Sequence, residues 1–282
     1  MHKGKLVICP TPLGNLGDIT QRTLDALCTC DVVFCEDTRV TGKLLAALGV
    51  SKPLERMDEA TIGKAGERVL ERVAAGQVVA YCSDAGMPGV SDPGARLVAL
   101  VRQAGHVVEV LPGPTAVATA YVASGFTTPS FYFGGFFPRK AGERQAVLEQ
   151  LAGLDAALIF YESPNRVVAA LQAIAQALPL RNVALCRELT KLHEEVLVAT
   201  AGELAAQLTS RDAIKGEIAL VIDAPSQQER ATEAEGALEA ATLRAQELLA
   251  QQDTTPKSAA KLLQEEFGLS RNDAYALVQS LK

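Results

Sequence analysis

Short apolar runs alternate with helical patterns over residues 1–118, and this alternation most limits the folds open to the chain. Strand candidates rich in apolar and β-branched residues lie at 5–9, 31–35, 77–82 and 107–111, with a weaker one near 53–57. Three of these runs, 5–9, 31–35 and 77–82, are apolar after their first residue rather than alternating, as strands covered on both faces should be. The pattern predicts a first α/β domain with a parallel sheet flanked by helices.

A second series of strand candidates begins after residue 130. They lie at 131–136, 156–161, 183–187, 195–199 and 217–222. Thr200 and Glu203 have the spacing of a capping box that opens a short helix. We therefore expect a second α/β domain over residues 119–225.

Beyond residue 225 the composition shifts to Ala, Glu and Gln without strand formers, which predicts a helical appendage over 226–282. Thr255 and Pro256 begin one helix, Gly268 ends it and Ser270 begins another. This spacing permits a helix-turn-helix, but a helical hairpin packed on its own apolar faces is the favoured interpretation.

The charge balance restricts the partners of the chain. The 282 residues carry a formal charge of −6, which argues against holding nucleic acid by bulk charge but leaves room for a local basic patch. The longest apolar runs, such as 97–101, fall far short of the roughly 18 residues that span a bilayer. The first residues also lack a signal-peptide pattern, so we expect a cytoplasmic protein.

Cysteine and histidine spacings do not indicate a metal site. The six cysteines show no CxxC pair and are expected to be reduced core residues. The three histidines lie far apart in the sequence and have no metal-ligand spacing.

Four loops follow strand candidates of the first domain, at the sheet edge where α/β proteins bind ligands. They are 10–18, 35–39, 83–94 and 112–116. None contains a GxGxxG fingerprint or a Walker loop, which disfavours a nucleotide-dependent oxidoreductase or kinase. The loop 83–94 holds several glycines, prolines and carboxylates, more than a simple turn needs. Together the loops predict one ligand cleft.

These loops resemble those of the tetrapyrrole methylase-fold methyltransferases, and within that family the branch that methylates small-subunit ribosomal RNA. The resemblance rests on TPLGNLGDIT, CEDTR, SDAGMPGVSDPG, PGPTA, FYESPNR, RELTK and GEIALVI, which begin at residues 11, 35, 83, 112, 160, 187 and 216. It implies two α/β domains with the cofactor S-adenosylmethionine in the cleft between them. It also implies 2′-O-methylation of a cytidine ribose in 16S ribosomal RNA, and a homodimer.

Carried onto this chain, the resemblance implies a set of cofactor-binding residues. They are Pro12, Asp84, Ala85, Gly86, Met87, Thr115, Ala116, Tyr161 and Glu162. The chain departs from many relatives at Val40, Met87, Asn165 and the segment 57–61. If the histidines of those relatives help to hold RNA, other groups must do so here.

Methyl transfer to a hydroxyl needs an aligned nucleophile and a group that removes its proton. Glu36, Asp37, Asp92, Glu188 and Lys191 are the candidates at the cleft edge. We predict Asp92, Lys191 and Glu188 as catalytic, since their motifs have no evident folding role. The alternative for Lys191 is a salt bridge to Glu188 or Glu194.

RNA binding needs cations and stacking surfaces. Phe136 and Phe137 precede Arg139 and Lys140, and Arg144 follows, which makes this the best RNA-binding segment in the chain. Arg39 and Lys43 are expected to extend it. The alternative is a solvated charged loop over buried phenylalanines.

Two other functions remain open. A methyltransferase of the same fold that acts on a tetrapyrrole would need arginines for the substrate carboxylates. A non-catalytic ribosome-associated binding module would not need so many small-residue loops at one sheet edge.

Overall fold

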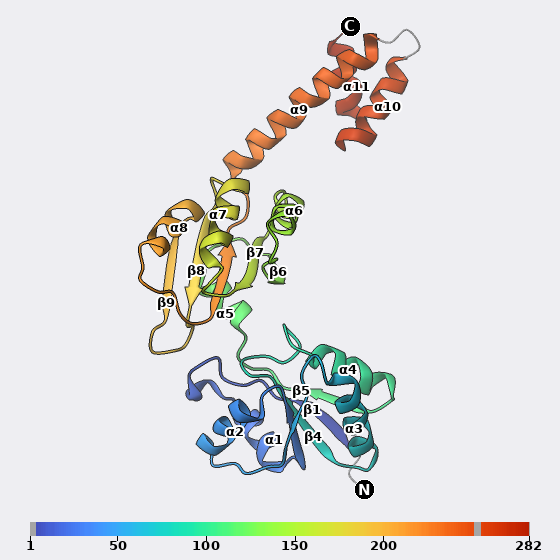
Figure 1. Ribbon diagram of the computed structural model, residues 1–282. Coiled ribbons are helices and arrows are strands. Elements are labelled where there is room, and N and C mark those ends of the chain that lie inside the picture. Colours follow the sequence, from blue (N-terminus) through green and yellow to red (C-terminus); the bar gives the residue numbers. More distant parts are fainter. Residues whose placement is uncertain (1–3, 251–254, 282) are drawn as a thin grey trace. The chain divides into compact units, whose positions relative to one another are not determined.

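The computed structural model describes residues 4–250 and 255–281, without the side chains of residues 233 and 234. The chain divides into two compact units, Met1–Ala224 and Pro225–Lys282. The first unit holds both sheets and the second is helical (Figure 1). Among the described residues every helix is too short or too polar to cross a membrane.

The first sheet is parallel throughout, as the apolar runs predict, and its strand order is β3-β2-β4-β1-β5. Its strands are β1 (Lys5–Ile8), β2 (Val32–Cys35), β3 (Leu54–Arg56), β4 (Val78–Cys82) and β5 (Val107–Val110). The connecting helices are α1 (Gln21–Thr29), α2 (Thr38–Ala47), α3 (Ile62–Ala74) and α4 (Gly94–Gln103).

Helices cover both faces of this sheet because successive strand residues point to opposite sides. Leu6 and Ile8 of β1 pack with α3 and α4, whereas Val7 lies in the core formed with α1 and α2. Figure 1 shows the two helix pairs on opposite sides of the strands. All six cysteines are free, and five are buried. Cys28 is exposed, so the prediction that it lies in the core is wrong; it sits on the outer face of α1.

The second sheet has the order β6-β7-β10-β8-β9, and only β6 and β7 are parallel. Its strands are β6 (Phe131–Phe136), β7 (Ala157–Glu162), β8 (Asn182–Arg187), β9 (Glu195–Thr200) and β10 (Ile218–Ile222). One face packs on α6 (Ala141–Leu151), α7 (Val167–Ala177) and α8 (Ala201–Thr209), and the other on α5 (Ala116–Ser124). The predicted boundary at 118/119 falls inside α5, whose Val117 and Ala120 lie in the core of this second sheet.

The second unit consists of α9 (Gln227–Ala250), α10 (Pro256–Phe267) and α11 (Arg271–Ser280) around a small apolar core. Thr255 and Ser270 cap α10 and α11, and Gly268 ends α10 with a φ of 65°, as predicted. The capping box of Thr200 and Glu203 at the start of α8 is also present.

A bulge in β6 controls where its aromatic side chains point. Phe133 pairs with Ile159 and Phe136 with Tyr161, so β6 has one residue more than β7 between these pairs. The extra residue lies at Gly134–Gly135, where Gly135 has a φ of 72°. As a result Phe133 and Phe136 both contact the Tyr161 ring, while Phe137 packs on buried Phe160.

Glu195 joins β9 to two arginines and should make stability depend on acid pH. Its carboxylate accepts hydrogen bonds from Arg211 at 2.7 and 2.8 Å and from Arg187 at 2.9 Å. The Arg211 guanidinium, with help from Arg187, lowers the pKa of Glu195 from 4.5 to about 2. Because the folded pKa lies below the unfolded one, this stabilisation is complete above pH 4.5 and is lost as pH falls toward about 2.

We expect the Glu195→Gln variant to lose less free energy of unfolding than the wild type over that pH range. The difference should be about 2 kcal/mol, allowing for solvent screening of a partly exposed group. Urea denaturation at a series of pH values measures it. Glu143→Gln, which removes an exposed partner of Lys140, is the control and should follow the wild-type curve. Parallel curves for Glu195→Gln and wild type would contradict the prediction.

Candidate functional site

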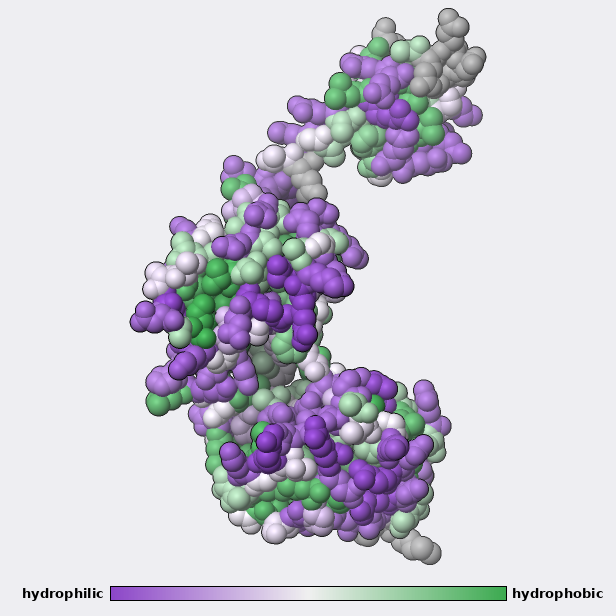
Figure 2. Space-filling view, in the orientation of Figure 1, coloured by the Kyte–Doolittle hydropathy of each residue, from purple (hydrophilic) through white to green (hydrophobic). Residues whose placement is uncertain are grey.

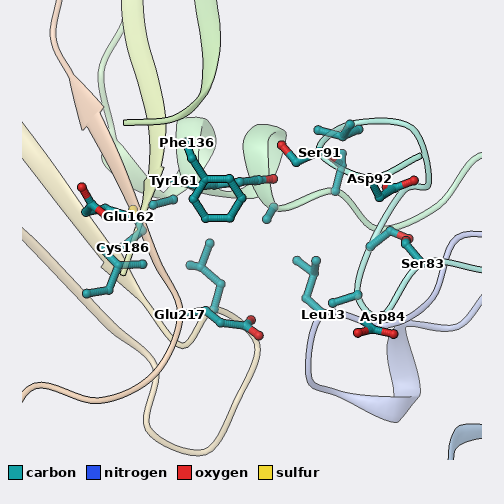
Figure 3. A pocket seen from close by; sticks show the side chains of 18 of the residues that line it. Leu13, Ser83, Asp84, Ser91, Asp92, Phe136, Tyr161, Glu162, Cys186 and Glu217 are labelled. Carbon is teal, nitrogen blue, oxygen red and sulfur yellow. The ribbon is translucent and has the colours of Figure 1, made fainter. Parts of the chain in front are cut away.

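A cavity of about 400 Å³ lies between the two sheets of the first unit. Figure 2 shows the surface hollowed between the two α/β halves. The loop after β4 forms one wall, and the ends of β6, β7 and β8 with the start of β10 form the other (Figure 3). This volume suits one small-molecule ligand.

Most of the predicted cofactor residues meet in this cavity. Asp84, Ala85, Gly86, Met87, Thr115, Ala116, Tyr161 and Glu162 all line it. Pro12 does not, although its neighbour Leu13 does. The cavity is also lined by Phe136, Cys186, Leu189 and Glu217, which we did not predict from the sequence as cofactor-binding. FYESPNR and GEIALVI marked the segments of Tyr161 and Glu217, but no local pattern pointed to Cys186.

Backbone hydrogen bonds hold the loop 83–94 against the first loop. Thr11 and Gly86 each donate an N–H to the other's carbonyl at 3.0 Å. The Thr11 hydroxyl also donates to the Ser83 carbonyl at 3.2 Å. Gly86 has a φ of 79°, a conformation that favours glycine. These contacts fix the backbone of the wall at Asp84 to Met87.

Asp92 organises the far end of the same loop. Its carboxylate accepts the N–H of Gly89 at 2.8 Å and that of Gly94 at 2.7 Å. The Tyr81 hydroxyl donates to it at 3.4 Å. Asp92 lines the cavity, as expected for its predicted catalytic role, but most of its acceptor capacity is used to hold the loop.

The loops after β2 and β4 are joined by two reciprocal hydrogen bonds. Asp84 donates its N–H to Glu36 Oε1 at 3.1 Å, and Asp37 donates its N–H to Asp84 Oδ1 at 3.1 Å. Asp37 also caps α2 and pairs with Arg39, whose guanidinium lowers the pKa of Asp37. Burial raises the pKa of Glu36 to about 7, with Asp92, Asp84 and Asp58 adding to the effect.

The charged side chains that line the cavity are all acidic. Five carboxylates line it, those of Glu36, Asp84, Asp92, Glu162 and Glu217, and no lysine or arginine is among its described lining residues. Glu162 is buried and paired with Arg166 at 2.5 Å. Burial raises the pKa of Asp84. A wall of this kind favours a ligand with positive charge and disfavours a polyanion.

Glu188 and Lys191, predicted as catalytic, lie outside the cavity lining. Lys191 Nζ lies 2.9 Å from Glu188 Oε1 and 3.1 Å from Glu217 Oε2. Of the two salt bridges that the sequence allows for Lys191, the one to Glu188 is formed. The other candidate partner, Glu194, accepts the Thr190 N–H instead. Burial acts to lower the pKa of Lys191, but its bonds to the two glutamates outweigh this and raise the pKa. Lys191 is held as a cation, which does not suit removal of a proton.

The predicted RNA-binding cations lie outside the cavity. Arg139 and Lys140 are exposed just before α6, and Arg144 is half-buried with its Nη1 3.5 Å from the Arg139 carbonyl. Arg39 and Lys43 are exposed one turn apart on α2. Phe136 connects the Arg139 segment to the cavity, because it lines the cavity while remaining 60% exposed. Among the described residues, no group of three or more His, Cys, Asp and Glu side chains could hold a metal ion.

Known proteins match this chain over most of its length. A sequence profile of the tetrapyrrole (corrin/porphyrin) methylases matches residues 5–205. Ribosomal RNA small subunit methyltransferase I of Mesorhizobium japonicum is 43% identical over 218 residues, 77% of this chain and 74% of that protein. The protein of the same name from Neisseria meningitidis serogroup B is 37% identical over 280 residues, 99% of this chain and 94% of that protein.

Solved structures show the same fold. Diphthine synthase matches with a TM-score of 0.62 at 14% identity, over 78% of this chain and 90% of that chain. Uroporphyrin-III C-methyltransferase from Thermus thermophilus, complexed with S-adenosyl homocysteine, matches with a TM-score of 0.54 at 17% identity, over 77% of this chain and 97% of that chain. The family profile and the relatives agree with the fold, and the chain belongs to the tetrapyrrole (corrin/porphyrin) methylase family.

Proposed function

We propose that this chain transfers a methyl group from S-adenosylmethionine to the 2′-hydroxyl of a cytidine ribose in small-subunit (16S) ribosomal RNA. The main support is its similarity to proteins named ribosomal RNA small subunit methyltransferase I, including one that it matches along nearly its whole length. The reaction at the cytidine 2′-oxygen comes from the resemblance of the loop motifs. We further propose that the chain works as a homodimer.

The cavity fits the proposed cofactor. S-adenosylmethionine supplies a methyl group on a positively charged sulfur and also carries an ammonium group. The carboxylates around the cavity suit these charges, and Ala85, Gly86 and Ala116 leave the backbone open to close approach. We assign the cofactor to the loop of Asp84–Met87, to Thr115 and Ala116, and to Tyr161 and Glu162. The loop of Pro12 supports it through Leu13.

A tetrapyrrole acceptor fits the cavity less well. Such substrates carry several carboxylates, which would meet the carboxylates of the wall without a lysine or arginine from the described lining residues. The salt bridge between Glu162 and Arg166 neutralises only one of these five carboxylates. RNA would instead meet the exposed cations outside the cavity and reach inward past Phe136.

The direct test is methyl transfer from labelled S-adenosylmethionine to small ribosomal subunits from a strain that lacks this protein. We expect labelled 2′-O-methylcytidine, identified by the mass of the nucleoside. Unlabelled subunits, with binding of S-adenosylhomocysteine intact, would refute the RNA substrate and point to a small-molecule acceptor. Loss of both would favour a non-catalytic binding module.

The cations near Phe136 give a prediction about RNA affinity. We expect the double variant Arg139→Ala, Lys140→Ala to raise the KM for subunits about tenfold at moderate salt, because each cation contributes a phosphate contact. The turnover number should change little. Lys64→Ala with Arg102→Ala removes two exposed cations from α3 and α4 and is the matched control. Equal KM values for both double variants would show that the segment does not bind RNA.

A further inference from the structure

The five carboxylates of the cavity differ in how fully they are engaged. Asp92 accepts backbone N–H groups from Gly89 and Gly94. Glu162 is paired with Arg166, and Glu217, whose side chain is 74% exposed, is paired with Lys191. Asp84 is exposed and accepts the N–H of Asp37. Glu36 accepts a single hydrogen bond, as Asp84 does, but Glu36 is half-buried whereas Asp84 and Glu217 are exposed.

Glu36 is held in place through one oxygen only. It follows fully buried Cys35 at the end of β2, and its Oε1 accepts the N–H of Asp84. Its Oε2 has no hydrogen-bond partner within the described part of the chain. The residue is half-buried and lines the cavity. A carboxylate fixed at one oxygen and available at the other is arranged to accept a proton from a ligand.

We propose that Glu36 is the general base that accepts the proton of the ribose 2′-hydroxyl, an assignment that rests on the proposed function. The O–H bond of the hydroxyl breaks and its proton moves to a carboxylate oxygen of Glu36. The electron pair left on oxygen forms the new bond to the methyl carbon, as the carbon–sulfur bond pair of the cofactor stays with sulfur. Glu36 then returns its proton to water.

The surroundings of Glu36 suit this task. Burial, with help from the carboxylates of Asp92, Asp84 and Asp58, raises its pKa to about 7. Asp58 is itself paired with Arg56 at 2.6 Å. Asp37, the next residue, is paired with Arg39. Tyr81 and Cys35 also lie close by, and burial raises the pKa of each, so both stay neutral. A base with a pKa near the pH of the cell is deprotonated for much of the time and still binds a proton well.

The test compares Glu36→Gln with the wild type. The amide oxygen can still accept the Asp84 N–H, so the loop contact is kept while the base is removed. We expect the single-turnover rate of subunit methylation to fall by about 10² to 10⁴-fold. The affinity for S-adenosylhomocysteine, measured by calorimetry, should stay within about threefold. Glu67→Gln, an exposed glutamate on α3, is the control and should keep the wild-type rate.

Two further readouts separate a base from a residue with a purely structural role. The wild-type rate should rise with pH up to about 7 and then level off, and Glu36→Gln should lose this step. Carbon-13 NMR of glutamate-labelled protein should show one carboxyl that titrates near pH 7 in wild type and is absent from the variant, without any substrate.

The possible failures are distinguishable. If the wild type methylates no RNA, the proposed function falls. If the wild type is active and Glu36→Gln keeps its rate and pH profile, the base assignment alone is overturned. It is also overturned if the variant loses affinity for S-adenosylhomocysteine by the same factor as rate, since Glu36 would then hold the cofactor.

Discussion

Replacing Asp92 by alanine is expected to weaken binding of S-adenosylhomocysteine by about 100-fold while the chain stays folded. The loop 83–94 supplies a large part of one wall of the cavity, and Asp92 ties it at the N–H groups of Gly89 and Gly94. Hydrogen bonds to a charged group contribute about 1.5 to 3 kcal/mol each. Losing two of them frees the loop and costs the binding energy needed to order it again.

The asparagine variant separates this positioning role from the catalytic role predicted for Asp92. Its amide side chain would keep one acceptor oxygen, so we expect Asp92→Asn to bind the product with intermediate affinity and to retain methyl transfer at saturating cofactor. A base would give the opposite result, with normal binding and a collapsed rate. Asp25→Ala, which changes an exposed residue of α1, is the control for both measurements. Calorimetry measures the affinity for S-adenosylhomocysteine, and single-turnover kinetics measure the rate of methyl transfer.

The sequence predicts the first sheet better than the second. Strands β1, β2 and β4 are buried on both faces, so apart from Lys5 at the start of β1 their residues are apolar and the runs are easily recognised. The order of the strands in the second sheet, and its mainly antiparallel pairing, depend on contacts far apart in the chain. The bulge at Gly134–Gly135 escaped prediction too, because two glycines in a strand-like run do not show which partner they face.

The candidate site was predictable where loops follow strands. The loops at 83–94 and 112–116 lie at the carboxyl edge of a parallel sheet, and the structure places both at the cavity. The partners of the charged residues were not predictable. Sequence spacing pairs Lys191 with Glu188, but its second partner, Glu217, lies 26 positions away. The sequence also does not show that the Asp92 carboxylate accepts backbone N–H groups. Nor does it show that Glu36 accepts a hydrogen bond at one oxygen and none at the other.

A large loss of stability is expected from a side chain at Gly134. A Cβ atom at this position would lie 2.1 Å from Cε1 of Phe160, whose ring is buried and packed edge-on against Phe137. Neither the ring nor the strand has room to move, because Phe160 belongs to the core of the second sheet. We therefore expect Gly134→Ala to lower the free energy of unfolding by about 3 kcal/mol, at the upper end of overpacking effects.

A double-mutant cycle tests the cause. Phe160→Ala alone should cost about 3 to 5 kcal/mol through the cavity it leaves. In the double variant the new methyl group occupies part of that cavity, so the combined loss should be smaller than the sum of the two single losses. Gly142→Ala is the control, because a Cβ there meets nothing within 4 Å. Additive losses in urea denaturation would show that the methyl group acts on the β6 bulge itself. In that case Phe136 would move out of the cavity wall, and the affinity for S-adenosylhomocysteine would fall together with stability.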